Sequence, residues 1–308
     1  MRKINIIVPS LTFSSFSYVG KIVKALLLSL VDNMFNPNDI VLSTSYLFGS
    51  LNVRVDDAFL CVMDGSRWCD IAWVDTALQI PSVSISNPAR FYTCSFWDKN
   101  KLEKLGIRVY GVVPRPVNPL IYRFKPSEKI YDFYVCGWYR EPDRKNFRFV
   151  DYVSQRHNVK IVGLTNYSGR FAERYDFGSL RENDKFDLIG KSRFCLFLSG
   201  SEGFGMPVLE SMSMGVPVVY LDAPAHNEFA VGLKVKADRV ERYKYWLGSY
   251  LAIVDIAIPD VKSLDDEISY AMGMGRDEYD DLSVRCIEKS REYMGLFLEW
   301  LHQTVIGS

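Results

Sequence analysis

Short apolar runs rich in β-branched residues alternate with amphipathic helical patterns along most of this 308-residue chain. Alternation of this kind predicts parallel strands joined by crossover helices, because a strand can rejoin its sheet in parallel only through a long connection. The pattern stops at the proline-dense segment 113–119 and then starts again. Prolines remove backbone donors and block regular structure, so the sequence predicts a linker there between two α/β domains.

Each half has its own set of expected elements. In the first half we expect a helix over Val19–Val31 and strands at about Ile4–Pro9, Asp39–Ser43, Ala58–Met63, Ile71–Val74, Ser82–Ser86 and Ile107–Val113. In the second half we expect strands at Tyr131–Cys136, Val159–Val162, Phe194–Leu198 and Val216–Leu221, and helices at Phe147–Gln155, Lys185–Lys191, Pro207–Met214 and Leu282–Val305. The aromatic segment Arg239–Ile258 shows no clear periodicity. The expected domains are residues 1–125 and residues 126–289.

The chain carries 37 basic and 37 acidic residues, a formal net charge of zero. Without an overall field, we expect neither nucleic acid nor an acidic membrane as a partner. The N-terminus runs directly into a strand pattern that is too short for a signal peptide. The longest apolar stretch, Tyr245–Ile258, is broken by Asp255 and is too short to span a membrane, so we expect a cytoplasmic protein. Aromatic residues at 243–250 leave open a weak peripheral contact with lipid, although core packing explains them as well.

Six cysteines are scattered along the chain without a C-x-x-C pair, and Cys136 and Cys195 lie in strand patterns. We expect buried, reduced thiols, with a disulfide between Cys69 and Cys94 left open. The three histidines lie far apart, and none has metal-binding spacing. No zinc site or other metal site is therefore expected.

The stretch Ser199–Val219 carries the strongest chemical signal in the chain. A strand ends there, a glycine-rich turn follows, and Pro207 stands where the first turn of a helix accepts proline. The unpaired N–H groups and the dipole at such a helix start favour an anion, and a diphosphate fits that geometry. Glu202 before the helix and Glu210 within it can then face the same cleft.

A group of basic residues follows the first strand of the second half. Arg140, Arg144, Lys145 and Arg148 come soon after Gly137, in a protein with no overall charge. Ligands of α/β proteins bind beyond the carboxyl ends of the strands, so this group is a second candidate anion site. A solvated turn, neutralised in part by neighbouring acids, is the alternative interpretation.

Around Glu202 the chain resembles the retaining glycosyltransferases of family 4 type, which have the GT-B fold. Their signature is two glutamates separated by seven residues around G-F-G-x-P, matched here from Glu202 to Glu210 and followed by G-V-P-V-V at 215–219. The runs at 135–140, 161–163 and 177–180 are similar to further landmarks of the family. The resemblance implies two Rossmann-like domains facing each other across a cleft, with a last helix at about 290–308 packing back onto the first domain.

The same resemblance implies the function. A hexose would move from a nucleoside-diphosphate sugar to an acceptor with retention of anomeric configuration, without a metal or other cofactor. The acceptor stays open between a glycan, a lipid and a protein. The implied catalytic residues are Glu202, Arg140 and Lys145, and the implied donor contacts are Gly137, Arg144, Leu180, Gly203, Phe204, Gly205, Met206 and Glu210.

The first half of the chain departs from the family pattern. The segment Ser14–Tyr18 stands in place of a glycine-rich loop, and Asn87 lies where many relatives carry a histidine. Ser14, Ser17 and Asn87 are therefore the candidate residues on the acceptor side. These departures leave two alternatives open, a catalytically inactive nucleotide-sugar-binding scaffold and a nucleotide-sugar epimerase on the same fold.

Overall fold

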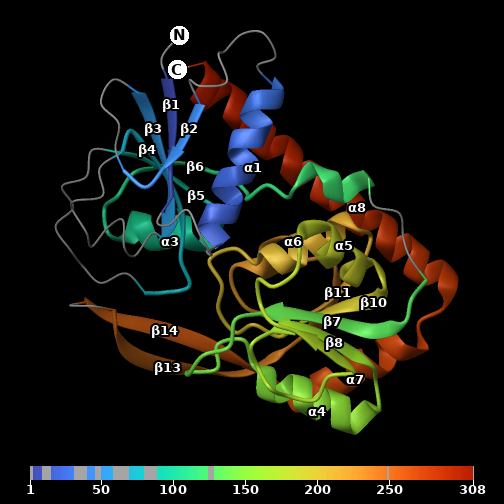
Figure 1. The fold of residues 1–308 in the computed structure, drawn as a ribbon. Coiled ribbons are helices and arrows are strands. Elements are labelled where there is room, and N and C mark those ends of the chain that lie inside the picture. Colours follow the sequence, from blue (N-terminus) through green and yellow to red (C-terminus); the bar gives the residue numbers. More distant parts are fainter. Residues whose placement is uncertain are drawn as a thin grey trace. The chain divides into compact units, whose positions relative to one another are not determined.

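A computed structural model describes residues 3–8, 15–30, 40–45, 50–57, 69–79, 89–123, 128–247 and 250–307. The chain forms two compact units (Figure 1). The first unit consists of Met1–Asn118, Tyr245–Ile253 and Tyr293–Ser308, and the second unit consists of Pro119–Lys244 and Val254–Glu292. Each unit contains one parallel sheet with its own helices, which confirms the predicted α/β fold class.

The sheet of the first unit has six described strands in the order β2-β1-β3-β4-β5-β6, and all neighbouring strands pair in parallel. Helix α1 packs against β1, β2 and β3, and helix α3 packs against β5 and β6. Ser95 caps α3, since its hydroxyl accepts a hydrogen bond from the backbone N–H of Asp98 at 3.1 Å. The elements are β1 (Lys3–Ile7), α1 (Ser15–Leu30), β2 (Ile40–Ser43), β3 (Ser50–Asp57), β4 (Ile71–Asp75), β5 (Arg90–Thr93), α3 (Phe96–Lys104) and β6 (Val109–Val112).

Aromatic side chains from both ends of the chain meet in the first unit. Trp73 on β4 is fully buried and stacks on Phe297 with 5.4 Å between ring centroids, and Trp300 lies 5.2 Å away. The Trp73 indole also donates a hydrogen bond to the carbonyl of Val113 at 2.9 Å. Burial of such large rings, with the indole nitrogen of Trp73 satisfied, ties the last helical residues to this sheet.

The sheet of the second unit has the strand order β12-β11-β10-β7-β8-β9, again with parallel pairing throughout. Figure 1 shows α4 and α7 on one side of this sheet and α5 and α6 on the other. The elements are β7 (Tyr131–Gly137), α4 (Phe147–His157), β8 (Ile161–Thr165), β9 (Glu173–Tyr175), α5 (Glu182–Gly190), β10 (Ser192–Phe197), α6 (Met206–Ser213), β11 (Val218–Leu221), β12 (Gly232–Val235) and α7 (Val261–Gly273), with short 3₁₀ turns at Pro119–Arg123 and His226–Glu228.

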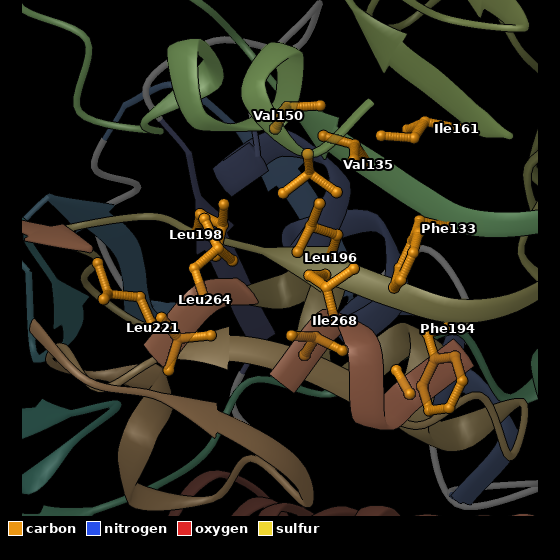
Figure 2. Close-up of a cluster of buried hydrophobic side chains, with 14 of the residues drawn as sticks. Phe133, Val135, Val150, Ile161, Phe194, Leu196, Leu198, Leu221, Leu264 and Ile268 are labelled. Atoms are coloured by element: carbon orange, nitrogen blue, oxygen red, sulfur yellow. The ribbon is translucent and has the colours of Figure 1, made fainter. Parts of the chain in front are cut away.

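The core of the second unit fills the space between its sheet and the helices α4 and α7 (Figure 2). Phe133, Phe194 and Leu196 from the sheet face Val150 of α4 and Ile268 of α7, and each side chain is almost fully buried. Burial of a large apolar side chain contributes about 1.5–3 kcal/mol, so this cluster fixes the sheet that carries the site described below.

The segment without predicted structure, Arg239–Ile258, lies within a two-stranded sheet of β13 (Ala237–Leu247) and β14 (Tyr250–Pro259). Its middle part belongs to the first unit, where Gln79 donates its backbone N–H to the carbonyl of Ile253 at 2.7 Å. The chain then forms α7, the long helix α8 (Arg276–Trp300) and a π-helical turn at Leu301–Ile306.

Every predicted element within the described residues has a counterpart in the structure, but the strands β3, β5, β9 and β12 and the helices α3 and α7 were not predicted. The expected strands Ala58–Met63 and Ser82–Ser86 lie outside the described residues. Strand β3 was missed although apolar and polar residues alternate strictly from Leu51 to Asp56. That alternation is a strand signal, but it predicts a polar side that faces solvent, whereas Asn52, Arg54 and Asp56 are buried.

Five of the cysteines fall within the described residues, and all five are buried and free, including Cys69 and Cys94. Within the same part of the chain, none of the helices is long and apolar enough to cross a membrane. The described residues also contain no cluster of three or more His, Cys, Asp or Glu side chains arranged to hold a metal ion.

Candidate functional site

The candidate site lies where the strand order of the second sheet reverses. From β7 the chain first adds β8 and β9 on one side, and it then crosses to add β10, β11 and β12 on the other. The carboxyl ends of the two strands at such a reversal form the usual ligand site of an open α/β sheet. Here the loops that follow β7 and β10 carry Lys145 and Glu202, respectively.

The two loops are tied to each other by hydrogen bonds. The backbone N–H of Gly200 donates to the carbonyl of Arg144 at 2.9 Å. The side-chain amide of the buried Asn146 donates to the carbonyls of Leu198 and Ala257 at 2.8 and 2.9 Å. These bonds fix the geometry of the site within one unit.

Glu202 is the centre of a buried cluster of charges. One of its carboxylate oxygens accepts hydrogen bonds from Lys145 and from the Ser199 hydroxyl, the latter at 2.5 Å, and the other lies 3.2 Å from the Arg144 guanidinium. Burial opposes ionisation, but the two cations and the hydrogen bonds outweigh it and hold the pKa of Glu202 well below its usual range. Glu202 is therefore ionised, and the cluster retains one net positive charge.

Lys145 is held in an apolar setting beside this carboxylate. Its ammonium lies 5.2 Å from the centroid of the Phe197 ring, and its stem packs against Gly137, where a Cβ would come within 3.2 Å of the Lys145 side chain. Burial lowers the pKa of Lys145, while Glu202 opposes that shift. The glycine at 137 thus provides the room that Lys145 needs.

The start of α6 lies in the same loop as Glu202. Gly205 has φ 108°, a left-handed conformation, and a Cβ there would approach the Cβ of His226 to 2.8 Å, so glycine is required twice over. Phe204 stacks on Phe229 with 4.7 Å between ring centroids. No side chain at the N-cap position accepts the first N–H groups of α6, which leaves a helix start suited to an anion. Gly203 and Met206 flank this turn.

Glu210 lies inside α6 and has a cation of its own. Lys185 of α5 donates a hydrogen bond to Glu210 at 2.8 Å and lies 3.1 Å from Glu182. Burial opposes the charge on Lys185, but these two carboxylates outweigh it and raise its pKa. The two glutamates of the signature are thus both buried, Glu202 with two basic partners and Glu210 with one.

The remaining predicted site residues are placed less centrally. Arg140 is exposed in the loop after β7, and Leu180 is half-buried just before α5. Ser14 and Asn87 lie outside the described residues, and Ser17 is in α1 but its side chain is not described. The structure therefore brings Arg144 and Lys145 to Glu202 and leaves the acceptor-side predictions untested.

Three residues of the site escaped the sequence analysis. Ser199 binds Glu202, Lys185 binds Glu210, and the fully buried His226 packs beside Gly205 while its Nε2 bonds the carbonyl of Leu221 at 2.9 Å. Ser199 could have been found as the polar residue that ends the strand before the glycine turn. Lys185 lies 25 positions from its partner and carries no local signal.

Comparison with known proteins identifies the family. The model of the family described as glycosyl transferases group 1 matches residues 144–243, which include both glutamates and the cations of the Glu202 cluster. "Putative glycosyltransferase 48" of Sulfolobus islandicus filamentous virus is 32% identical over 235 residues, which cover 72% of this chain and 72% of that protein. The chain belongs to the group 1 glycosyltransferase family. "Putative glycosyltransferase 41" of the same virus is 29% identical to this glycosyltransferase over 269 residues, 86% of this chain and 76% of that protein.

Solved structures of low sequence identity share the fold of this glycosyltransferase. HepE of Anabaena in complex with UDP has a TM-score of 0.64 at 11% identity and matches 99% of this chain and 100% of its own. WaaG, a glycosyltransferase of lipopolysaccharide biosynthesis, has a TM-score of 0.57 at 10% identity and matches 95% of each chain. The two parallel-sheet α/β domains of this glycosyltransferase thus have the GT-B architecture.

Proposed function

We propose that this glycosyltransferase takes a hexose from a nucleoside-diphosphate sugar and transfers it with retention of anomeric configuration, without needing a metal ion. The observation that carries the proposal is the buried Glu202 cluster beside the start of α6. Two cations share one carboxylate there, so the cluster has a positive charge to offer to an incoming diphosphate.

The leaving group sets the main demand on the site. As the bond from the sugar to the diphosphate breaks, negative charge grows on the phosphate oxygens. Arg144 and Lys145 can donate hydrogen bonds to these phosphate oxygens as well as to Glu202. The N–H groups at the start of α6 add the fixed dipole of the helix. Since such groups are already oriented and dehydrated, they stabilise developing charge without reorganisation.

Glu202 suits a different task. Because Arg144 and Lys145 hold its pKa well below the usual range, Glu202 is ionised at neutral pH, and we assign it no general-acid role. An ionised carboxylate can stabilise positive charge that develops on the sugar. A donor phosphate oxygen would then accept the proton of the acceptor, as retention by front-face attack requires. Glu210, held by Lys185, is assigned to the ribose of the donor.

A structural neighbour suggests which donor to test first. HepE of Anabaena has also been solved with UDP and glucose, with a TM-score of 0.59 at 12% identity over 98% of this chain and 99% of its own. Uridine diphosphate and its hexose conjugates are therefore the first candidates for this chain.

The proposal is tested by thermal denaturation with UDP, GDP, ADP and dTDP and their sugar conjugates, with magnesium or with chelator. A ligand at about 100 times its Kd adds roughly 2.7 kcal/mol of stability, which gives a measurable shift in Tm. We expect one base to be selected, chelator to make no difference, and Lys145→Ala to remove the shift while Lys191→Ala, at an exposed ion pair with Asp187, keeps it.

Turnover separates an enzyme from an inactive scaffold. We expect Lys145→Ala to lower sugar transfer at least about 100-fold, as loss of one charge-stabilising group does. Absence of a shift with every nucleotide would overturn the donor site. Binding without transfer to any of a panel of acceptors would instead support the scaffold, and nucleotide-sugar isomerisation without acceptor would support the epimerase.

A further inference from the structure

A cavity lies in the second unit, between the loop after β7, the start of α4 and the two-stranded sheet of β13 and β14. Its volume is about 150 Å³. Arg144, Lys145 and Glu202 are not among its lining residues, so it is separate from the cluster described above. Neither the glycosyltransferase activity nor the proposed donor site assigns it a role.

Tyrosine rings form most of the apolar wall of this cavity. Tyr139 and Tyr167 come from the loops after β7 and β8, Tyr243 comes from β13, and the buried Ile256 and Ile258 of β14 complete the wall. Tyrosines thus present ring faces and edges to the space, with aliphatic side chains behind them. A wall of this kind favours a ligand with an apolar face.

Two of these rings are held in place before any ligand arrives. Tyr139 and Tyr167 pack with 4.9 Å between centroids, and Phe147 stacks beneath Tyr167 at 5.0 Å. The backbone of Tyr139 exchanges two hydrogen bonds with the Asn166 side chain, at 2.6 and 2.9 Å, and the Tyr167 hydroxyl donates to Asp151 at 2.7 Å. Because these side chains are already ordered, little entropy is lost when a ligand stacks on them.

Asp143 lines the same space, and one of its carboxylate oxygens is buried without a hydrogen-bond donor among the described residues. One oxygen of Asp143 accepts the backbone N–H of Arg148 at 3.2 Å, at the start of α4. Its other oxygen, Oδ1, is buried and accepts no hydrogen bond from any residue that the structure describes. An unsatisfied buried acceptor is unfavourable, so a hydroxyl donor from a ligand would relieve it.

The mouth of the cavity adds both a donor and an acceptor. The exposed Arg148 guanidinium can donate hydrogen bonds, and the exposed Glu141 carboxylate can accept them. A neutral polyol uses donors and acceptors together. A quaternary ammonium group, which also favours tyrosine rings, would be attracted by Glu141 and Asp143 and repelled by Arg148, but it has no N–H or O–H to donate to an acceptor.

The volume limits the ligand to about one ring. A cavity of about 150 Å³ admits a six-membered ring such as benzene, whereas pockets for larger organic ligands measure about 300–1,000 Å³. A pyranose is a six-membered ring with an apolar C–H face and a rim of hydroxyl groups. It matches the tyrosine wall on its face and Asp143 on its rim.

We propose that this cavity binds one pyranose residue of a neutral saccharide, separately from the nucleotide-sugar donor. The sugar ring packs its C–H face on the tyrosines, donates a hydroxyl to Asp143 Oδ1 and accepts from Arg148. The site would therefore hold one residue of a glycan while the Glu202 cluster holds the nucleotide.

Binding of the methyl glycosides of glucose, mannose and galactose to the full chain is measured by saturation-transfer NMR and by calorimetric titration. Choline is the competing probe. We expect transfer to the ring protons of at least one glycoside, and none to choline. Tyr243→Ala should weaken binding about three- to tenfold, the effect of one lost aromatic contact. Asp143→Asn, which can keep its carbonyl oxygen on the Arg148 N–H, should weaken binding at least about tenfold.

Two matched variants act as controls. Tyr270→Ala removes an exposed tyrosine whose hydroxyl also bonds a glutamate, as that of Tyr243 does, but Tyr270 lies on α7 outside the cavity. It should leave glycoside binding unchanged. Lys145→Ala should also bind the glycoside normally but should no longer bind the nucleotide. Tyr243→Ala should still bind the nucleotide. Failure of one site is therefore distinguished from failure of the other.

Three results would overturn this proposal. The first is absence of transfer to every glycoside by the folded chain. The second is glycoside binding that survives both Tyr243→Ala and Asp143→Asn but disappears in Lys145→Ala, which would assign the sugar to the donor site. The third is binding of choline in place of the glycosides, which would make the cavity a cation site.

Discussion

Replacing Glu202 by glutamine should destabilise the second unit, because it leaves two buried cations without their counter-charge. The side chains of Glu202, Lys145 and Arg144 are 11%, 13% and 27% exposed. Removing one partner of a buried ion pair costs about 3–5 kcal/mol. Arg144 keeps some contact with water, and glutamine retains an oxygen for Lys145, so we expect a loss of about 2–3 kcal/mol.

A double-mutant cycle isolates the interaction. Urea unfolding at pH 7 would be measured for the parent chain, Glu202→Gln, Lys145→Met and the combined variant. The combined variant removes one charge of each sign, so it should be less destabilised than the sum of the two single variants, by about 1–3 kcal/mol. Asp184→Asn, which breaks an exposed ion pair with Arg181, is the matched control and should leave the midpoint nearly unchanged.

A ligand measurement adds a result that a purely structural ion pair would not give. Glu202 competes with a diphosphate for Arg144 and Lys145, so pyrophosphate should stabilise Glu202→Gln more than it stabilises the parent chain. The reasoning is refuted if Glu202→Gln unfolds at the parent midpoint with an additive cycle. Equal stabilisation of both chains by pyrophosphate would separate the cluster from anion binding.

Three further predictions follow from the same site. Burial lowers the pKa of His226 from 6.5 to about 4, so between these values only the unfolded chain binds a proton at this residue, and stability falls as the pH drops. His226→Gln should flatten the slope of unfolding free energy against pH in this range by up to about 1.4 kcal/mol per pH unit. An unchanged slope would contradict the assignment. Gly205→Ala should lower the free energy of unfolding in urea by at least about 2 kcal/mol, which is more than for Gly106→Ala, since Gly106 also has a positive φ but has open space around it. Equal decreases would mean that the chain avoids the contact with His226 without an energetic cost. Lys185→Met leaves the buried Glu210 without its cation and should lower the free energy of unfolding by about 3–5 kcal/mol. A decrease no larger than that of the control Asp184→Asn would show that the pair of Lys185 and Glu210 is solvated.

The sequence predicted elements correctly where neighbours in sequence are also neighbours in space. The turn from β10 into α6 was predictable because a strand end, three closely spaced glycines and Pro207 specify it within ten residues or so. The same stretch contained both glutamates of the site. Strand β3 was missed despite its alternating pattern, and only the structure shows that its polar side is buried, where Arg54 pairs with Asp56 and Asn52 bonds Asp70.

Partners far apart in the chain were decided by the tertiary structure. Lys145 and Glu202 are 57 positions apart and meet because β10 pairs with β7. Sequence analysis proposed Arg140 and Lys145 as catalytic residues and Arg144 as a donor contact, and only the fold selects Arg144 and Lys145 as the partners of Glu202.

The sequence by itself thus determined the fold class, the strand-turn-helix unit and the kinds of residue that the site would use. The tertiary structure decided which cation meets which carboxylate, and it built the tyrosine-lined cavity from residues spread from Tyr139 to Ile258. The physical reason is range. Helix, strand and turn preferences act between near neighbours in the chain, whereas ion pairs and cavity walls depend on the order in which strands pair and helices cover them.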